Sequence, residues 1–171
     1  MTNPDPKKLA AIRLVVFDVD GVFTDGRFYL ADDGTETKAF NTQDGYGVRR
    51  LLGAGIAVAV ISGRRSGAVE RRMKELGVAH VFQGCGDKVH VFEGLLADLQ
   101  LEADSAAYVG DDIPDLHLLQ CVALPIAVAN AVPEVKKACA WVTTAAGGFG
   151  AVREVCELIL GGSTDDYPPA S

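Results

Sequence analysis

The sequence predicts an α/β fold, a doubly wound, Rossmann-like parallel sheet with helices on both faces. Short segments that are apolar and often β-branched throughout recur along the chain, which is typical of strands buried on both faces. Longer helix-like segments alternate with them, which favours right-handed crossovers between parallel strands. Since 171 residues correspond to about one domain, we expect a single domain over residues 1–171 that binds ligands at the carboxyl ends of its strands.

The individual elements follow from apolar periodicity. The predicted strands cover, in chain order, residues 14–18, 56–61, 80–83, 106–110, 124–129 and 141–144. The predicted helices cover residues 44–55, 66–77, 88–100 and 149–160. Gly77 and Gly161 stand where the second and the fourth of these helices would end.

Residues 26–40 interrupt this alternation and predict a projecting β-hairpin. Two short runs flank Asp32, Asp33 and Gly34, a composition that favours a tight turn. The apolar residues of the hairpin need a cover, which is either another subunit or the hairpin's own domain. These residues are Phe28, Tyr29, Leu30 and Phe40.

Composition and charge exclude several classes of protein. Sixteen Lys and Arg against 23 Asp and Glu give a net charge of -7, which argues against nucleic acid or a membrane as partner. No stretch resembles a signal peptide or approaches the ~20 apolar residues of a membrane span, so we expect a cytoplasmic protein. The four cysteines have no metal-binding or disulfide spacing and are expected to be reduced. The polar residues 162–171 predict a mobile tail.

The first predicted strand ends in two carboxylates on one side of the sheet. Asp18 and Asp20 alternate with Val19, and Gly21 then allows a sharp turn. Such a pair repels itself unless a cation or a shared proton lies between the two groups. Mg²⁺ is the cation that prefers carboxylate oxygens together with substrate phosphate. The alternative is a turn in which the two aspartates only bind the backbone.

Two further polar sites follow other predicted strands. Ser62 and Gly63 precede a helix whose N-terminus suits a phosphate, although such residues also join elements for structural reasons alone. Lys88 begins the predicted helix 88–100, where a cation opposes the helix dipole. A nearby anion explains this lysine better than local stability does, and a solvated surface lysine is the alternative.

A second acidic group follows the predicted strand 106–110. Asp111 and Asp112 come directly after it, and Asp115 follows within one turn. One carboxylate is enough to cap the next helix. The surplus of carboxylates therefore indicates a metal ion.

Together these motifs resemble those of the haloacid dehalogenase-like phosphohydrolases. The resemblance covers nearly all of residues 13–160. It implies that Asp18 is the nucleophile and forms an aspartyl-phosphate, and that Asp20 is the general acid and base. Ser62 and Lys88 would then stabilise the phosphate and the intermediate.

The same resemblance implies a magnesium cofactor. Asp18, Asp111 and the backbone carbonyl of Asp20 would hold the ion, and Asp112 would support Asp111. Neither gap between the motifs is long enough for the cap domain that many relatives insert. We therefore expect that another subunit, or the substrate itself, excludes water from the site.

A closer resemblance is to the capless, tetrameric 3-deoxy-D-manno-octulosonate (KDO) 8-phosphate phosphatases. The segments that carry it are residues 18–30, 38–51, 61–66, 82–84, 109–112 and 145–160. This family implies a homotetramer in which the hairpins form a central barrel and neighbouring chains complete each site. It also implies a sugar phosphate substrate and a product used in lipopolysaccharide biosynthesis. The substrate-binding residues carried over are Asp20, Asn41, Thr42, Gln43, Asp44, Gly45, Arg49, Arg64, Arg72 and Lys88.

Two other functions compete with this interpretation. One is a phosphatase for a nine-carbon, sialic-acid-type 9-phosphate, because that sugar acid carries the same two anionic ends. The other is a non-catalytic oligomerisation module, like the related domains fused to nucleotide-sugar synthetases. One departure from the family is Phe149, which stands where many relatives carry a basic residue and predicts weaker substrate affinity.

Overall fold

The computed structural model describes residues 4–161, so the predicted tail 162–171 lies outside the described residues. Six strands form one sheet in the order β5-β4-β1-β6-β7-β8. Every neighbouring pair in the sheet is parallel, which confirms the predicted fold class. The strands are β1 (Leu14–Phe17), β4 (Ala57–Ser62), β5 (His80–Gln83), β6 (Ala106–Gly110), β7 (Leu124–Ala127) and β8 (Trp141–Val142).

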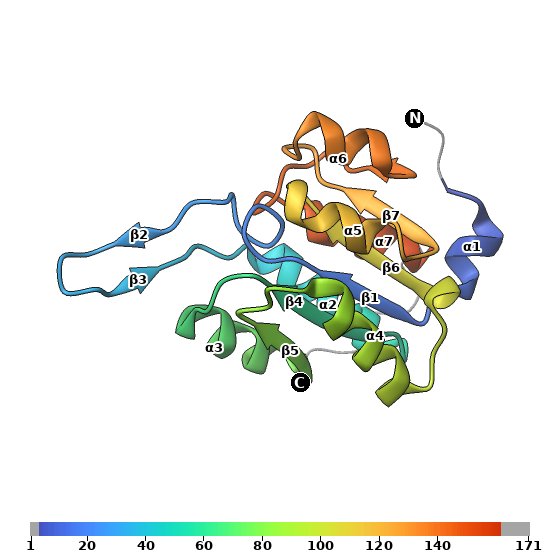
Figure 1. The fold of residues 1–171 in the computed structure, drawn as a ribbon, viewed down its shortest axis with the longest axis horizontal. Helices are drawn as coiled ribbons and strands as arrows, with labels where there is room; N and C mark the ends of the chain where they lie inside the picture. The colour runs from blue at the N-terminus through green and yellow to red at the C-terminus, as the bar shows by residue number, and fades with distance from the viewer. Residues whose placement is uncertain (1–3, 162–171) are drawn as a thin grey trace.

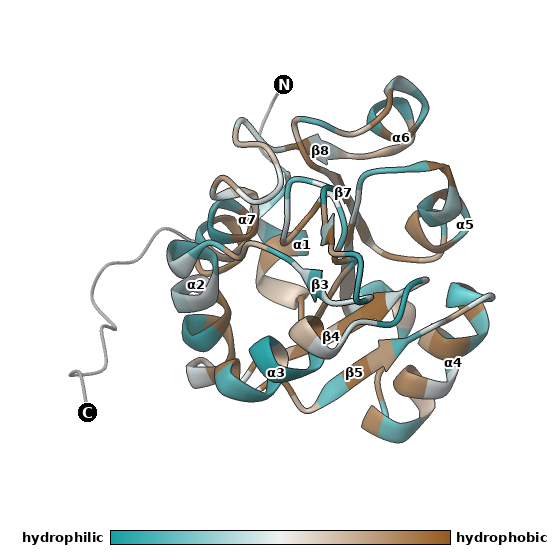
Figure 2. Cartoon of the chain, turned by 90° about the vertical axis from the view of Figure 1, so that its left-hand side faces the viewer, coloured by the Kyte–Doolittle hydropathy of each residue, from teal (hydrophilic) through white to brown (hydrophobic). Residues whose placement is uncertain are grey.

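Helices cover both faces of this sheet. They are α1 (Pro6–Ala11), α2 (Thr42–Gly53), α3 (Gly67–Leu76), α4 (Lys88–Leu99), α5 (Leu116–Leu119), α6 (Pro133–Ala138) and α7 (Ala151–Ile159). Figure 2 shows α2, α3 and α7 on one side of the hydrophobic strands and α4, α5 and α6 on the other. Within residues 4–161, no helix is both long and apolar enough to cross a bilayer.

The central strand β1 anchors the core. All four of its residues are fully buried, and Phe17 pairs with Val60 of β4 and Val109 of β6. Burial of such a side chain contributes about 1.5–3 kcal/mol, so the ends of these three strands are held firmly side by side. This arrangement places whatever follows β1, β4 and β6 at one edge of the sheet.

Helix boundaries differ slightly from the predicted ones. Helix α2 begins two residues earlier than predicted because Asn41 caps it, accepting a hydrogen bond from the Gln43 amide at 2.8 Å. Helix α3 ends at Gly77, which has the left-handed φ of 81° that favours glycine. The short helices α1 and α6 have too few residues for a periodic pattern, and the sequence did not predict them. A further helix was expected after the strand 106–110, and a 3₁₀ turn followed by α5 lies there.

The predicted hairpin is a projecting arm made of β2 (Tyr29–Leu30) and β3 (Glu36–Thr37), and it extends from the body in Figure 1. Phe28, Tyr29 and Leu30 are 38%, 69% and 68% exposed. The arm's own domain therefore does not cover Tyr29 and Leu30, and that alternative is wrong for these two residues. Phe28 is partly covered by Arg64 of its own chain, which lies 4.0 Å from the ring centre. Phe40 differs because it lies where the arm returns to the body, and it packs against the core.

Candidate active site

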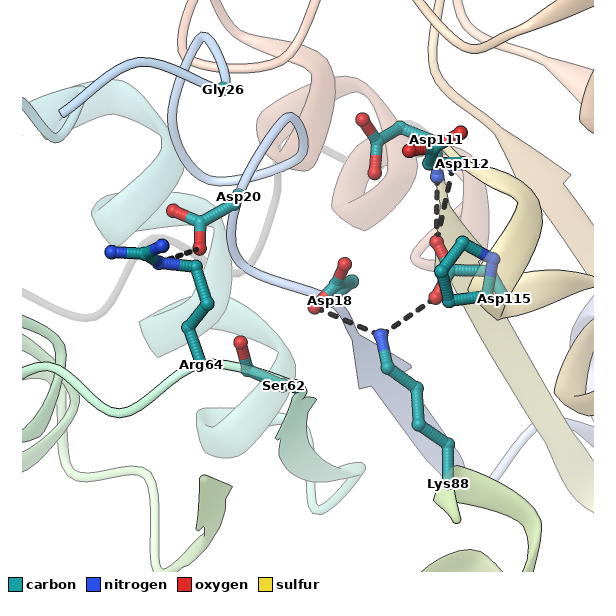
Figure 3. Close-up of a pocket in the computed structure, with 11 residues that line it drawn as sticks. Asp18, Asp20, Gly26, Ser62, Arg64, Lys88, Asp111, Asp112 and Asp115 are labelled. Carbon is teal, nitrogen blue, oxygen red and sulfur yellow. Dashed lines mark hydrogen bonds and ion pairs between the residues drawn. The ribbon is translucent and has the colours of Figure 1, made fainter. Parts of the chain in front are cut away.

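A cavity of about 310 Å³ lies where β1, β4 and β6 end. Its lining includes residues from all four sequence motifs (Figure 3). The lining residues are Asp18, Asp20, Gly26, Ser62, Gly63, Arg64, Lys88, Asp111, Asp112, Pro114 and Asp115. The structure thus brings together every candidate catalytic and metal-binding residue that the sequence suggested.

Lys88 reaches this cavity from the first turn of α4. Its ammonium nitrogen lies 3.1 Å from Asp18 Oδ1 and 2.7 Å from Asp115 Oδ1. Burial disfavours its charge, but the carboxylates of Asp18 and Asp115 outweigh burial and raise the pKa of Lys88. Lys88 is therefore a buried, paired cation, and the solvated alternative is wrong.

Asp115 holds Lys88 in place. Its Oδ1 accepts hydrogen bonds from Lys88 and, at 2.6 Å, from the buried Tyr108 hydroxyl. Its Oδ2 accepts from the amides of Asp111 and Asp112 at 3.0 and 3.3 Å. Both oxygens are thus committed, so Asp115 positions Lys88 and the turn that carries Asp111. The sequence showed this residue only as a surplus carboxylate, because nothing near it in the chain indicates its partners.

Asp18 and Asp111 are the carboxylates that remain for a cation. Carboxylate oxygens of Asp18, Asp111 and Asp115 lie within 4.8 Å of one another. Asp18 Oδ1 is buried and has no hydrogen-bond partner among the described residues, since its contact with Lys88 is an ion pair. Gly21 leaves room for Asp111, because a Cβ there would lie 1.9 Å from Asp111 Oδ2. This donor set fits a hard divalent cation.

Asp18 and Asp111, the two carboxylates that could bind a cation, have strongly raised pKa values. Burial and then the charge of Asp115 raise the pKa of Asp18 to about 6. Burial and then the charges of Asp18 and Asp115 raise the pKa of Asp111 to about 7. The charge of Lys88 lowers both pKa values but does not outweigh burial and the neighbouring carboxylates.

Asp20 lies on the other side of the cavity, beside the base of the arm. Its Oδ1 forms an ion pair with the Lys38 ammonium, and its Oδ2 lies 3.7 Å from Arg64 Nε. Arg64 Nη2 also pairs with Glu36 Oε2 at 2.9 Å. Lys38 escaped the sequence analysis, because a lysine within an exposed hairpin pattern carries no sign that it is buried.

Ser62 and Asp112 occupy different positions in the cavity wall. Ser62 is the last residue of β4 and is 4% exposed. Asp112 is exposed and caps a 3₁₀ turn (Ile113–Asp115), accepting a hydrogen bond from the Ile113 amide at 2.8 Å. The capping alternative thus holds for Asp112, and its predicted support of the metal ligand stays a prediction.

Seven of the predicted sugar-binding residues do not line this cavity. Asp44 is buried and accepts a hydrogen bond from the Arg153 amide at 2.8 Å, so it caps α7, and burial raises its pKa. Arg49 donates a hydrogen bond to the backbone oxygen of Glu75 at 3.1 Å, and Arg72 donates one to the Glu75 carboxylate at 3.0 Å. The seven residues are Asn41, Thr42, Gln43, Asp44, Gly45, Arg49 and Arg72.

A glycine-rich turn at residues 145–150 supports the loop after β1. Asn130 bridges the two segments, donating to Gly21 O at 3.0 Å and accepting from the Gly147 amide at 2.6 Å. A Cβ on Gly147 would lie 1.8 Å from Gly21 O, so only glycine permits this approach. In the same turn Phe149 is 68% exposed and lies outside the cavity lining.

Comparisons with known proteins agree on one family. A family model described as haloacid dehalogenase-like hydrolase matches residues 78–154. The 3-deoxy-D-manno-octulosonate 8-phosphate phosphatase of Yersinia pestis is 47% identical over 154 residues, which cover 90% of this chain and 82% of that protein.

Two solved structures show which ions such relatives bind. The phosphatase from Moraxella catarrhalis, in complex with magnesium ion, phosphate ion and KDO, is 44% identical with a TM-score of 0.89, over 93% of this chain and 91% of that chain. The cobalt-bound enzyme from Haemophilus influenzae is 39% identical with a TM-score of 0.87, over 90% of each chain.

Proposed function

Because the chain belongs to the 3-deoxy-D-manno-octulosonate 8-phosphate phosphatases, which are haloacid dehalogenase-like hydrolases, we propose that it hydrolyses this sugar phosphate to KDO and inorganic phosphate. The observation that carries the proposal is the meeting of Asp18, Asp20, Ser62, Lys88 and Asp111 around one cavity. These residues come from four separate strand ends or helix starts, and a scaffold domain has no need of such a group.

Asp18 is the proposed nucleophile. One of its carboxylate oxygens forms a bond to phosphorus, and the bond between phosphorus and the sugar oxygen breaks. Lys88, 3.1 Å from Asp18, reduces the repulsion between the carboxylate and the phosphoryl group. Water then cleaves the aspartyl-phosphate, so that one slow hydrolysis becomes two faster displacements.

Asp20 is the proposed general acid and base. It donates a proton to the departing sugar oxygen and later takes one from the attacking water. Its carboxylate lines the same cavity as Asp18 but lies on the opposite side of it from Asp111 (Figure 3). Arg64 and Lys38, rather than Lys88, are the cations beside it.

Asp18, Asp111 and the backbone carbonyl of Asp20 would hold the magnesium ion. Clustered carboxylates with raised pKa values support this assignment, as do the magnesium and cobalt ions in the structures of relatives. When bound, Mg²⁺ supplies positive charge to the phosphoryl oxygens. Asp115 is not part of this set, because its oxygens are already hydrogen-bonded.

The assembly and the place of the reaction in the cell are further parts of the proposal. The exposed apolar residues of the arm support the predicted homotetramer. Of the predicted sugar-binding residues outside the cavity of their own chain, Thr42, Gln43 and Arg49 are exposed, which suits a tetramer in which neighbouring chains complete each site. A cytoplasmic location and a role in lipopolysaccharide biosynthesis stay predictions from the resemblance.

Phosphate release from a panel of sugar phosphates, with and without a chelator, tests this function. We expect the highest kcat/KM for KDO 8-phosphate and loss of activity with the chelator, restored by Mg²⁺. Asp18→Asn should lower kcat by at least about 10³-fold, because an amide cannot act as the nucleophile. Unchanged turnover of Asp18→Asn would eliminate the proposed nucleophile.

The same panel separates the competing functions. The names of the relatives favour the eight-carbon substrate. A higher kcat/KM for a nine-carbon sialic-acid-type 9-phosphate would reverse that preference. A complete lack of phosphatase activity in a folded, magnesium-loaded sample would support the oligomerisation module instead.

A further inference from the structure

Lys38 is a buried cation at the base of the arm. It follows β3 directly, and its side chain is 0% exposed. Removing an ammonium group from water costs several kcal/mol unless close partners compensate it. The partners of Lys38 therefore indicate why a lysine stands there.

The closest partner of Lys38 is the Asp20 carboxylate. The Lys38 nitrogen forms an ion pair with Asp20 Oδ1, and Glu36 Oε1 lies farther away at 4.0 Å. The ring of Phe28 lies 5.9 Å from the same nitrogen. Lys38 is not among the residues that line the cavity.

The two oxygens of Asp20 are consequently not equivalent. An ammonium group only donates hydrogen bonds, so the oxygen that it binds is one that carries no proton. Oδ1 is bound by Lys38 in this way. Oδ2 lies 3.7 Å from Arg64 Nε, which is too far for a hydrogen bond, so Oδ2 is left as the oxygen that can hold the proton. In Figure 3, the oxygen of Asp20 that faces Arg64, a residue of the cavity lining, is Oδ2.

We propose that Lys38 is a positioning residue that orients the Asp20 carboxyl so that Oδ2 delivers the proton to the leaving oxygen. This inference rests on the proposed function. In the step concerned, an Asp18 oxygen bonds to phosphorus and the bond from phosphorus to the sugar oxygen breaks with its electrons on oxygen. The proton of Asp20 Oδ2 passes to that oxygen, while Lys38 stays bound to Oδ1 and does not touch the substrate.

The surroundings of Lys38 hold it in this orientation. Arg64, at the end of β4, pairs with Glu36 of the arm at 2.9 Å and stacks on Phe28, 4.0 Å from the ring centre. Glu36 and Phe28 are both neighbours of Lys38 as well. The base of the arm is therefore joined to the sheet edge that carries the catalytic residues.

The test compares two substrates that differ in their need for a proton. A sugar alkoxide leaves only with a proton, whereas p-nitrophenolate leaves without one. Since kcat/KM reports the steps up to departure of the leaving group, we expect Lys38→Met to lower kcat/KM for KDO 8-phosphate by about 10–100-fold. The kcat/KM for p-nitrophenyl phosphate should fall by less than about threefold, since its leaving group needs no help from Asp20.

The ratio of kcat/KM for KDO 8-phosphate to kcat/KM for p-nitrophenyl phosphate does not depend on the folded fraction of the enzyme, because both substrates are assayed on one preparation. Equal losses for both substrates, or no loss for either, would overturn the inference. Lys38→Arg keeps a donor for Oδ1 and should restore most of the ratio. Arg50→Met breaks a buried ion pair with Glu157 far from Asp20, and it should lower Tm without changing the ratio.

The proposed function and the role of Lys38 can fail separately. If the unmodified enzyme does not hydrolyse KDO 8-phosphate, the proposed substrate is wrong. Lys38 is then tested with aryl phosphates of graded leaving-group pKa. The dependence of kcat/KM on that pKa should be steeper in Lys38→Met than in the unmodified enzyme, and equal slopes would contradict the positioning role.

Discussion

At the scale of single residues, Asp115 shows how a buried carboxylate can serve a site without touching the substrate. It is 1% exposed, and four hydrogen bonds from Lys88, Tyr108 and two backbone amides use both of its oxygens. Its negative charge allows Lys88 to remain charged in a buried place. Removing that charge should therefore affect both stability and catalysis.

We predict that Asp115→Asn lowers the free energy of unfolding by roughly 3 kcal/mol, because the variant breaks a buried ion pair and places an amide NH₂ against hydrogen-bond donors. In a domain of this size Tm should fall by about 6–12 °C. The kcat of the folded fraction should fall as well, since Lys88 loses the partner that orients it. Calorimetry and steady-state kinetics measure the two effects.

Asp112→Asn is the matched control for stability. Asn caps helical turns about as well as Asp does, so Tm should stay within about 2 °C of the parent. An equal loss of Tm in Asp112→Asn and Asp115→Asn would contradict the role that the structure gives to Asp115. A weaker magnesium affinity in Asp112→Asn alone would support its predicted help to the metal ligand.

Asp111 leads to a prediction about pH. Its pKa is raised to about 7 in the folded protein from 3.8 for a solvated aspartate, so the folded state keeps a proton that the unfolded chain has lost. This contribution favours folding at low pH and is lost as pH rises from about 4 through 7. Without metal, the free energy of unfolding of Asp111→Asn at pH 8 should therefore exceed that of the parent by on the order of 1 kcal/mol or more, with a correspondingly higher Tm, and the difference should vanish near pH 4.

Added Mg²⁺ should reverse the order of the two Tm values at pH 8, so that the parent becomes more stable than Asp111→Asn. The ion should raise the Tm of the parent at pH 8 and leave that of Asp111→Asn nearly unchanged, because the variant lacks one carboxylate ligand. Thermal shift assays at pH 4, 6 and 8, with and without Mg²⁺, give the comparison. Equal stabilisation of both proteins by Mg²⁺ would show that Asp111 does not bind the ion.

At the scale of elements, the turn at residues 145–150 is the support of the loop after β1. Glu154 of α7 binds the amides of Thr144 and Ala145 at 2.9 Å, which fixes the start of the turn. Asn130 and Gly147 then contact Gly21, in the loop that carries Asp20. A change in this turn should thus be transmitted to the catalytic carboxylates.

We predict that Gly147→Ala lowers stability by about 1–3 kcal/mol and also lowers kcat, because its Cβ would overlap Gly21 O and displace the loop. Gly94→Ala in α4 is the matched control. No atom lies within 4 Å of a Cβ at Gly94, so this change should stabilise the helix by about 1 kcal/mol and leave kcat unchanged. Unfolding curves and kinetics of both variants test the pair, and an unchanged kcat in Gly147→Ala would contradict the coupling.

The elements themselves were predictable to different degrees. Strands such as β1 and β4 were recognised because buried parallel strands are continuously apolar, and α3 and α4 because their apolar residues recur at helical spacing. Helix α5, with four residues, and α6, with six, are too short for periodicity to show. Tertiary packing rather than local propensity decides such short helices.

At the scale of the whole molecule, the arm is the element whose apolar residues a single chain leaves exposed. Phe28, Tyr29 and Leu30 would expose an apolar surface to water if the chain stayed alone. We predict that Leu30→Asp shifts the proposed tetramer to smaller species and lowers activity, because neighbouring chains complete each site in that proposed assembly. Light scattering after size exclusion gives the mass of each species.

Leu30→Met is the control, since it keeps an apolar side chain of similar volume at the same place. It should retain the mass and the activity of the parent. A tetramer that survives Leu30→Asp would mean that the arm is not the interface. A monomeric parent with full activity would contradict the predicted assembly altogether.

The sequence by itself determined the doubly wound fold and most of the residues that meet in the candidate active site. Continuous apolar runs specify buried strands, and the residues at the carboxyl ends of parallel strands meet at one edge of the sheet. The proximity of Asp18, Ser62 and Asp111 could therefore be predicted from the sequence. Only the tertiary structure decided which buried charges pair. Lys88 meets Asp115 and Lys38 meets Asp20 across 27 and 18 positions of the chain, and Asn130 meets Gly21 across 109. Residues so far apart leave no periodic signal in the sequence, because packing of the whole sheet and of the arm, rather than local chain geometry, sets the distances between them.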